Sequence, residues 1–237
     1  MKEYPIKISK SNNITDRKVL TKYAWIFSLG DGCLMSGFSK NRSNKNVNAF
    51  FGCGQLADNE DYILWRADIL SNITSVYLQC KSKDRRPQID TITGHHPFFT
   101  TLRSRMYLNG HKVVDPHDLK LLDWEALAIL YQDDGCLSKK PKGNNCYTLS
   151  LSTESFSYGE QVMLQRAIKD KTDILFRINS IRTAGGLHYR LVISKYENIV
   201  SFLAGVKPFI KPSFEYKLLS GVQYPFYSRQ KTDDETV

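Results

Sequence analysis

The chain has 237 residues, 41% of them hydrophobic and 24% charged, with a net charge of +9; this composition describes a globular protein long enough for one large domain or two small ones. No apolar run approaches the roughly 20 residues of a membrane-spanning helix, and no targeting segment follows Met1, so we expect no membrane contact. The five cysteines are odd in number and form no close pair, which argues against zinc and favours an intracellular, reducing compartment (a bacterial or phage cytoplasm, or an organelle matrix) over secretion.

The first half of the chain is predicted to be a short arm followed by three helices and two hairpins. Residues 1–20 are polar and irregular, and we expect the arm there. The apolar run at residues 21–31 predicts a helix that Gly32 ends. The remaining elements of residues 21–110 are expected to be a hairpin over 34–55, a helix over 60–71 capped by Asp58 or Asn59, strands over 76–80 and 88–93, and a helix from Pro97 to about 109.

The second half, residues 123–227, repeats that order after a connector at residues 111–122. Its expected elements are a helix over 123–134, a hairpin with its tip at 139–145, a helix over 155–169, strands over 174–182 and 187–194, and a helix over 195–205. The polar tail at 228–237 is expected to be disordered. The strands mix basic and amide side chains with aromatic and β-branched ones, as antiparallel sheets with one polar face do. We therefore predict an α+β fold with two pseudo-symmetric αββαββα halves.

One helix end occurs twice in the chain. The sequence Asp-Gly-Cys-Leu at residues 31–34 recurs at residues 134–137, 103 positions later, and both copies follow an apolar run with helical character. A repeat at this spacing indicates two similar halves. Asp31 and Asp134 end their helices, where the macrodipole is already negative, and bringing two such ends together raises the carboxylate pKa values by like-charge repulsion. These two aspartates are the predicted centre of the chemistry.

The positive charge is concentrated in the predicted strands and hairpins. Residues 36–56, 75–93, 137–150 and 174–194 contain 13 of the 33 Lys and Arg residues but only two of the 24 acidic residues. These segments carry +11, so the rest of the chain carries −2. A solvated surface would mix both signs, and we therefore predict that the sheets present a face that binds a polyanion.

The repeated helix ends and basic hairpins resemble the LAGLIDADG homing endonucleases in their double-motif, single-chain form. Residues 127–135 match the signature in their Leu-Ala start and Asp-Asp-Gly end, and residues 24–32 match it mainly through their last four positions. Ile26 and Ile129 replace the glycine expected third in the signature, so we expect the two helices to pack together in a different way. Three further segments resemble the omega-intron branch of this family: residues 152–158, 206–212 and 215–218.

The resemblance implies a site-specific DNA endonuclease that makes a double-strand break by hydrolysing one phosphodiester in each strand. Asp31 and Asp134 fall where the family has its metal-binding carboxylates, and the residues before them, Gly30 and Asp133, are included in the predicted metal site. Asp133 has no acidic counterpart in the first copy, so we expect its role to be mainly structural. Mg²⁺ suits carboxylate, carbonyl, water and phosphate oxygens, and we expect Mn²⁺ to substitute for it.

Four more residues are candidates for the active site by the same resemblance. Lys217 matches a lysine that borders the active site in the family, and Lys112 stands where its first-half partner would be. A lysine there can stabilise developing phosphate charge or organise water. Gln55 and Glu154 are expected at the ends of equivalent strands, near the metals. Glu215 and Lys217 also match the Glu-x-Lys of restriction-type nucleases, but that fold does not predict the repeated helix.

The strands are expected to lie along the major groove of double-stranded DNA, where Arg and Lys read guanine, Asn and Gln read adenine, and the remaining basic residues bind phosphates. In the first half the candidates for DNA contact are Lys40, Arg42, Asn44, Lys45, Lys81, Lys83, Arg85, Arg86 and Gln88. In the second half they are Lys139, Lys140, Lys142, Asn144, Asn145, Arg177, Asn179, Arg182, His188 and Arg190.

The main alternative is a protein of this fold that has lost cleavage, either an intron maturase or a regulator that binds DNA or RNA. The two retained aspartates favour the enzyme. Intein splicing is not expected, because the chain ends show neither the nucleophile nor the asparagine that it requires. The two hairpin tips differ in sequence, and unlike halves in one chain do not require a palindromic site. We therefore expect a monomer on one long, non-palindromic duplex, with no protein partner required.

Overall fold

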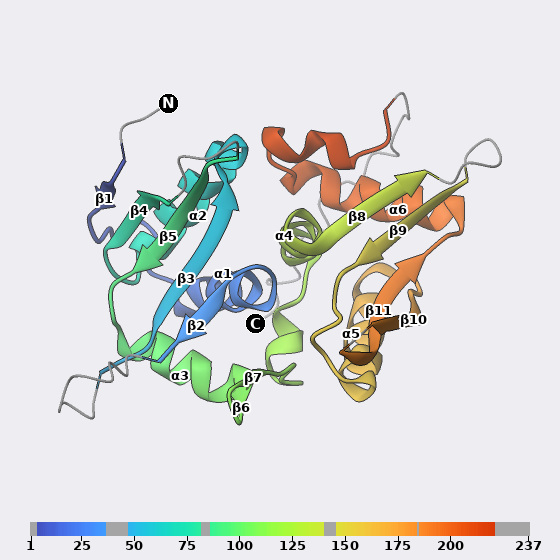
Figure 1. The fold of residues 1–237 in the computed structure, drawn as a ribbon, viewed down its shortest axis with the longest axis horizontal. Helices are drawn as coiled ribbons and strands as arrows, with labels where there is room; N and C mark the ends of the chain where they lie inside the picture. The colour runs from blue at the N-terminus through green and yellow to red at the C-terminus, as the bar shows by residue number, and fades with distance from the viewer. Residues whose placement is uncertain (1–3, 37–46, 82–85, 140–145, 184, 221–237) are drawn as a thin grey trace, which may run out of the picture.

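The computed structural model describes residues 4–36, 47–81, 86–139, 146–183 and 185–220. The elements form two halves that lie side by side, each in the order helix, hairpin, helix, hairpin, helix (Figure 1). The predicted α+β fold with two pseudo-symmetric halves is therefore confirmed. No helix in these ranges is both long enough and apolar enough to cross a membrane.

The first half begins with a short strand and the first motif helix. Its elements are β1 (Ile6–Ile8), α1 (Arg17–Leu29), β2 (Cys33–Met35), β3 (Phe50–Leu56), α2 (Glu60–Ser71), β4 (Val76–Cys80), β5 (Gln88–Thr93) and α3 (Pro97–Met106). The Asp16 side chain caps α1 by accepting from the backbone amide of Lys18 at 2.7 Å, so the helix starts four residues before the predicted Thr21.

The second half follows a connector that contains β6 (Tyr107–Leu108), β7 (His111–Lys112) and a 3₁₀ turn at Asp118–Leu121. Its elements are α4 (Trp124–Asp134), β8 (Gly135–Lys139), β9 (Tyr147–Leu151), α5 (Tyr158–Thr172), β10 (Arg177–Thr183), β11 (Gly186–Ile193), α6 (Tyr196–Val206) and two 3₁₀ turns at Lys207–Phe209 and Pro212–Lys217. Ser157 and Glu160 form a capping box at the start of α5, which explains why this helix begins three residues after the predicted Ser155.

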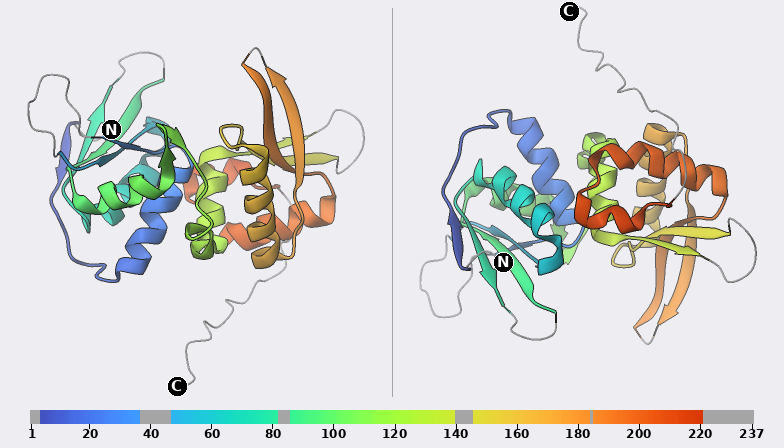
Figure 2. Two further views of the ribbon diagram at one scale, coloured as in Figure 1. Left: turned by 90° about the horizontal axis from the view of Figure 1, so that it is seen from below. Right: turned by 90° about the horizontal axis from the view of Figure 1, so that it is seen from above.

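The two sheets have the same strand order, apart from the additional edge strand β1 in the first. The first is β1-β4-β5-β3-β2 and the second is β10-β11-β9-β8, with antiparallel neighbours throughout. Leu78 in β4 and Leu191 in β11 are fully buried on the side that faces the helices. Because side chains alternate along a strand, the opposite side of each sheet is free for a ligand. The β4–β5 and β10–β11 hairpins project from the same side of the molecule (Figure 2, left).

The motif helices α1 and α4 pack against each other in parallel where the halves meet. Near their starts, Lys22 Nζ lies 2.8 Å from carboxylate oxygens of both Asp123 and Glu125. Near the middle, Ile26 and Ile129 are buried, so the positions that are glycine in the signature contribute apolar side chains to the core. The parallel arrangement brings both C-terminal helix ends to one place.

The segment after the last helix of each half crosses to the other half. The backbone amide of Val114 donates to Glu160 of α5 at 2.9 Å, and that of Ser213 donates to Asp61 of α2 at 3.2 Å. Phe214 also packs edge-on against Tyr62 of α2, with ring centroids 5.3 Å apart. These reciprocal contacts join the halves around the ends of α1 and α4.

Two expectations for the first half were wrong in detail. Residues 6–8, expected to be irregular, form β1, which pairs with β4 at the edge of the first sheet. Asn59 precedes α2, but its side chain does not cap the helix; its amide donates to Gln55 Oε1 at 3.2 Å instead. The predicted tail at 228–237, residues 37–46 of the first predicted hairpin and residues 140–145 of the second lie outside the described residues.

Candidate active site between the two halves

The two predicted metal-binding aspartates lie at the C-terminal ends of the motif helices. Asp31 follows α1 by two residues, and Asp134 is the last residue of α4. Because α1 and α4 run in parallel, with Lys22 near the start of α1 beside Asp123 at the start of α4, Asp31 and Asp134 lie at the same end of the helix pair. The charge of Asp31 contributes to the raised pKa of Asp134, as two neighbouring anions require.

Gln55 connects the two motif ends through its side-chain amide. Its Nε2 donates to Asp31 Oδ2 at 2.6 Å and to Asp133 Oδ1 at 3.3 Å. Tyr62 of α2 also donates its hydroxyl proton to Asp133 Oδ1, at 2.9 Å. The structure therefore brings Gln55 to the predicted centre. It adds Tyr62 and Asn59, neither of which was predicted to belong to the site.

Glu154 lies in a different environment from Gln55. Cys33 pairs with Gly52, whereas Cys136 pairs with Ser150, so the second hairpin is five residues shorter than the first. Counted from these pairs, the counterpart of Gln55 is Thr153, and the expected equivalence with Glu154 is wrong. The Glu154 carboxylate forms an ion pair with Arg190 of β11.

Lys112 and Lys217 occupy equivalent places in the two halves. Lys112 Nζ donates to the backbone oxygens of Gly30 at 2.9 Å and Gly32 at 3.1 Å, beyond the end of α1. Lys217 Nζ donates to the backbone oxygens of Tyr131 at 3.2 Å and Gln132 at 2.7 Å, in the last turn of α4. Each lysine thus satisfies carbonyls that a helix end leaves without partners.

The carboxylates at this end of the helix pair have raised pKa values. Burial raises the pKa of Asp134 to about 7, and the charges of Asp31 and Asp133 contribute to the rise. Burial also raises the pKa of Asp133 and that of Asp31, although Asp31 retains contact with solvent. Burial lowers the pKa of Lys112 and Lys217, against the opposing effect of the carboxylates. Negative charge is unfavourable here, and a bound cation would relieve that cost.

Arg66 of α2 is a buried cation beside this cluster. Its side chain is fully buried, and its guanidinium lies 5.3 Å from the centre of the Tyr62 ring. Nη2 donates to Thr91 at 3.3 Å, but Nε and Nη1 have no hydrogen-bond partner among the described residues. The charge of Arg66 lowers the pKa of Asp133 and Asp31 and so opposes the effect of burial.

Gly30 and Asp133, the other two residues of the predicted metal site, are engaged within the protein. The Gly30 carbonyl accepts from Lys112, and Asp133 Oδ1 accepts from Tyr62 and Gln55. No three His, Cys, Asp or Glu side chains of the described residues form a metal cage. Asp31 and Asp134 thus fit an open site that substrate and water oxygens complete, as Mg²⁺ prefers.

The register of β10 and β11 divides the predicted DNA-contacting residues between two faces. Asn179 pairs with Arg190, and Ile181 pairs with His188. By alternation, Arg177, Asn179, His188 and Arg190 lie on the face opposite the core, whereas Arg182 lies on the face of buried Leu191. Four of these five candidates therefore share the face opposite the core, and Arg182 does not.

In the first sheet the free face contains Lys81 and Gln88, together with Tyr77 and Gln79, which were not among the predicted DNA contacts. Gln79 and Tyr77 alternate with buried Leu78 and Val76, and Tyr77 is 43% exposed. Lys81 forms an ion pair with Asp90 on the same face. Arg86 lies two residues before β5, and Lys139 shares the face of Leu137 at the end of β8. Ten candidates lie outside the described residues: Lys40, Arg42, Asn44, Lys45, Lys83, Arg85, Lys140, Lys142, Asn144 and Asn145.

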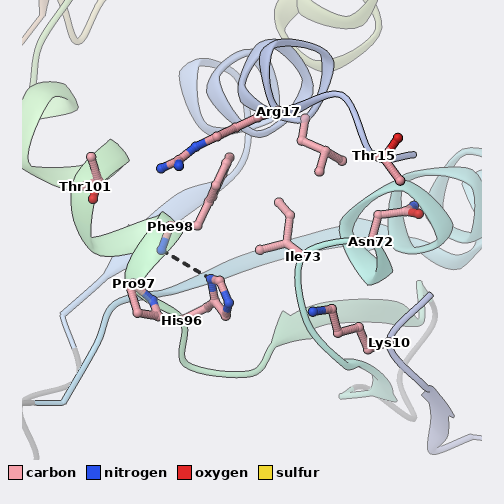
Figure 3. Close-up of a pocket in the computed structure, with 10 residues that line it drawn as sticks. Lys10, Thr15, Arg17, Asn72, Ile73, His96, Pro97, Phe98 and Thr101 are labelled. Atoms are coloured by element: carbon pink, nitrogen blue, oxygen red, sulfur yellow. Dashed lines mark hydrogen bonds between the residues drawn. The ribbon is translucent and has the colours of Figure 1, made fainter. Parts of the chain in front are cut away.

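A pocket of about 400 Å³ lies at the other end of α1 (Figure 3). Its lining includes apolar Ile73 and Phe98 and basic Lys10, Arg17 and His96. Since α1 has 13 residues, this pocket is roughly 20 Å along the helix from Asp31. It is a separate feature from the carboxylate site.

Known proteins resemble this chain in sequence and in fold. Protein RecA of Mycolicibacterium chitae is 29% identical over 198 residues, which cover 81% of this chain and 44% of that protein. DNA endonuclease I-ChuI of Chlamydomonas applanata is 32% identical over 102 residues, 41% of this chain and 43% of that protein. The chain thus spans less than half the length of these two relatives.

Among solved structures, the homing endonuclease I-WcaI bound to its DNA recognition sequence superposes with a TM-score of 0.65. The match covers 86% of this chain and 88% of that one at 19% identity, so it supports the fold. The narrower likeness to the omega-intron branch stays a prediction. The sequence model of the LAGLIDADG DNA endonuclease family matches residues 27–199, and the chain belongs to this family.

Proposed function

We propose that this protein is a homing endonuclease that makes a site-specific, metal-dependent double-strand break in a long, non-palindromic DNA site. The observation that carries this proposal is the pair Asp31 and Asp134, one carboxylate at the end of each motif helix. Burial raises the pKa of both, and the charge of Asp31 adds to the rise at Asp134. Each half, residues 21–110 and 123–227 with the connector 111–122 between them, reads its own side of the cut.

Asp31 and Asp134 are the residues that would bind the divalent cations, Mg²⁺ or Mn²⁺ in its place. When bound, such cations polarise a scissile phosphate, steady the leaving oxygen and lower the pKa of the attacking water. The protein's part is to keep two carboxylates ionised and in place. Gln55 does so for Asp31 through the 2.6 Å hydrogen bond. Gly30 and Asp133 contribute to the shape of the site, because their oxygens already accept hydrogen bonds from the protein.

Lys112 and Lys217 act on the site from the helix ends. Their ammonium groups bind carbonyls at the ends of α1 and α4 and lie close enough to the carboxylates for their charges to lower the pKa of Asp31 and Asp134. They therefore favour the ionised carboxylates and add positive charge where a phosphate would arrive. Glu154 contributes on the DNA side, by orienting Arg190.

The free faces of the two sheets bind the duplex. Arg177, Asn179, His188 and Arg190 in the second sheet, and Lys81 and Gln88 in the first, are polar side chains on strands that flank the carboxylates. Arg and Asn side chains on such strands can read base edges in the major groove, and the other basic residues can bind phosphates. A single chain with two unlike halves acts as a monomer on one duplex, without a protein partner.

Cleavage of a randomised duplex library tests this function. The library is incubated with the protein and Mg²⁺, and the ends of cut molecules are sequenced. We expect one long, non-palindromic site cut in both strands, and one protein chain per duplex in sedimentation. Selection of a bound site without cleavage in Mg²⁺ or Mn²⁺ would contradict the endonuclease and favour the binding protein.

A further inference from the structure

The hydrogen bonds around Asp133 form a network that connects Tyr62 of α2 to the carboxylate of Asp31. Tyr62 donates to Asp133 Oδ1 at 2.9 Å, Gln55 Nε2 lies 3.3 Å from the same oxygen, and Gln55 Nε2 lies 2.6 Å from Asp31 Oδ2. Asn59 donates to Gln55 Oε1 at 3.2 Å. Because both ends of the Gln55 amide have partners, the orientation of this side chain is fixed by the network.

Asp133 belongs to α4, but every one of these partners belongs to the first half. Its side chain lies over Gly30, where an added Cβ would be 2.5 Å from Asp133 Oδ2. Asp133 Oδ2 is buried and has no hydrogen-bond partner among the described residues. A carboxylate so placed is costly, and the nearby charge of Arg66 offsets part of the cost. The second half thus extends an anion into the core of the first.

The second half has no equivalent arrangement around Asp134. Thr153, the counterpart of Gln55 by register, donates its hydroxyl to Gln161 Oε1 at 2.8 Å. Gln161 Nε2 in turn donates to the backbone oxygen of Tyr189 at 2.9 Å. In the described part of the chain, no hydrogen bond joins Thr153 or Gln161 to Asp134. Of the two predicted metal-binding carboxylates, therefore, only Asp31 is held by such a hydrogen-bond network among the described residues.

We propose that Asp133, Tyr62 and Asn59 are positioning residues for the first half-site, and that they fix Gln55 so that it orients the Asp31 carboxylate. Asp134 is oriented without such a network. This inference rests on the proposed endonuclease function. Its consequence is that cleavage of only one DNA strand depends strongly on these three residues. Loss of the network therefore slows cleavage of that strand more than cleavage of the other.

Strand-resolved cleavage by Tyr62→Phe tests the consequence, with Thr153→Val as the matched control. Each substitution removes one buried hydroxyl, the first from the Asp133 network and the second from the Thr153–Gln161 contact. With the two strands labelled differently, we expect Tyr62→Phe to change the ratio of the two nicking rates by about tenfold, the effect of one lost hydrogen bond to a charged group. Thr153→Val should leave the wild-type ratio unchanged.

The alternative is that the network only stabilises the contact between the halves. In that case Tyr62→Phe and Thr153→Val would lower the melting temperature but slow both strands equally, and this result would overturn the inference. If Tyr62→Phe does not fold, Asn59→Ala removes the donor to Gln55 Oε1 without touching a carboxylate, and the same change in ratio is expected. Absence of cleavage by the wild-type protein would instead refute the proposed function.

A measurement on the metal-free protein without DNA tests whether the network fixes Gln55, independently of whether the protein cleaves DNA. The side-chain amide protons of Gln55 are followed by NMR in ¹⁵N-labelled protein and assigned by their loss in Gln55→Glu. We expect two resolved, slowly exchanging resonances in the wild type and in Thr153→Val, and faster exchange in Tyr62→Phe. Unchanged Gln55 resonances in Tyr62→Phe would show that Asp133 and Tyr62 do not fix this side chain.

Discussion

Asp133 of α4 lies directly over Gly30 of the first motif, so that a Cβ at Gly30 would be 2.5 Å from Asp133 Oδ2 and 2.9 Å from Asp133 Cβ. The two residues precede the two predicted metal-binding aspartates and correspond to each other in the repeat. The residue at position 30 must therefore be small, because the Asp133 side chain crosses the interface between the halves and lies beside it. The difference between the motifs is a consequence of packing.

Gly30→Ala should destabilise the protein for this reason. The added methyl group would force Asp133 away from Gln55 and Tyr62, and overpacking of a buried contact costs about 1–3 kcal/mol. Chemical denaturation measures the change in unfolding free energy. Gly159→Ala is the control, because Gly159 lies in α5 with open space around it, and alanine there should be neutral or stabilising by about 0.5–1 kcal/mol. Equal effects at both positions would refute the close contact.

The metal-free protein should lose stability as the pH rises from about 4 to 7. The pKa of Asp134 is raised to about 7, above its unfolded value, so between these pH values the folded state binds more protons than the unfolded state. Stability then falls with pH until Asp134 is ionised in both states. Thermal unfolding in EDTA measures this slope.

Asp134→Asn should flatten that dependence and raise stability at pH 8, because it removes an ionised carboxylate from beside Asp31 and Asp133. Asp170→Asn, an exposed substitution in α5, is the control and should leave the slope unchanged. The raised pKa of Asp134 would be contradicted if the wild-type protein became more stable between pH 4 and 7 and Asp134→Asn abolished that increase.

Lys112→Met should weaken both the fold and cleavage. The substitution removes the donor to the Gly30 and Gly32 carbonyls, and loss of hydrogen bonds from a charged group costs about 1–3 kcal/mol. It also removes a positive charge beside Asp31. Lys120→Met, at an exposed site in the connector, is the control for loss of one lysine. If Lys112→Met matched Lys120→Met in both unfolding free energy and cleavage rate, the role proposed for Lys112 at the end of α1 would be refuted.

DNA binding should depend strongly on salt, because the basic residues are concentrated on the strands. For 6–10 phosphate contacts, affinity should fall by roughly 10³–10⁵ between 50 and 200 mM salt. Fluorescence anisotropy in EDTA measures the slope of log affinity against log salt, and Arg177→Ala should reduce it by about 1 if Arg177 binds a phosphate. A nearly flat dependence would argue against a DNA-binding face on the two sheets.

Most of the fold was predictable from the sequence because its signals are local. The strands at Val76–Cys80 and Gln88–Thr93 and the helix at Glu60–Ser71 have the predicted bounds, set by alternation and by helical spacing. By contrast, β1 has three residues and exists only through its pairing with β4. The early start of α1 depends on Asp16, a capping residue within a polar stretch.

The candidate site was predictable in part. Asp31 and Asp134 follow from the duplication, and the family resemblance added Lys112, Lys217 and Gln55, which all lie at this end of the helix pair. Arg66 and Tyr62 show only helical periodicity in the sequence, and nothing local indicates that an arginine is fully buried beside carboxylates. Glu154 was matched to Gln55 because the five-residue difference between the hairpins becomes visible only through strand register.

Cleavage and binding by Asp31→Asn and Asp134→Asn, measured on the selected site with Mg²⁺, test whether these two carboxylates serve cleavage and not DNA recognition. Each substitution removes a carboxylate charge without changing the size of the side chain, and neither aspartate lies on the free face of a sheet. We expect that either variant fails to make double-strand breaks and binds the site with near wild-type affinity in a gel shift. A double variant that still cuts both strands would contradict this expectation.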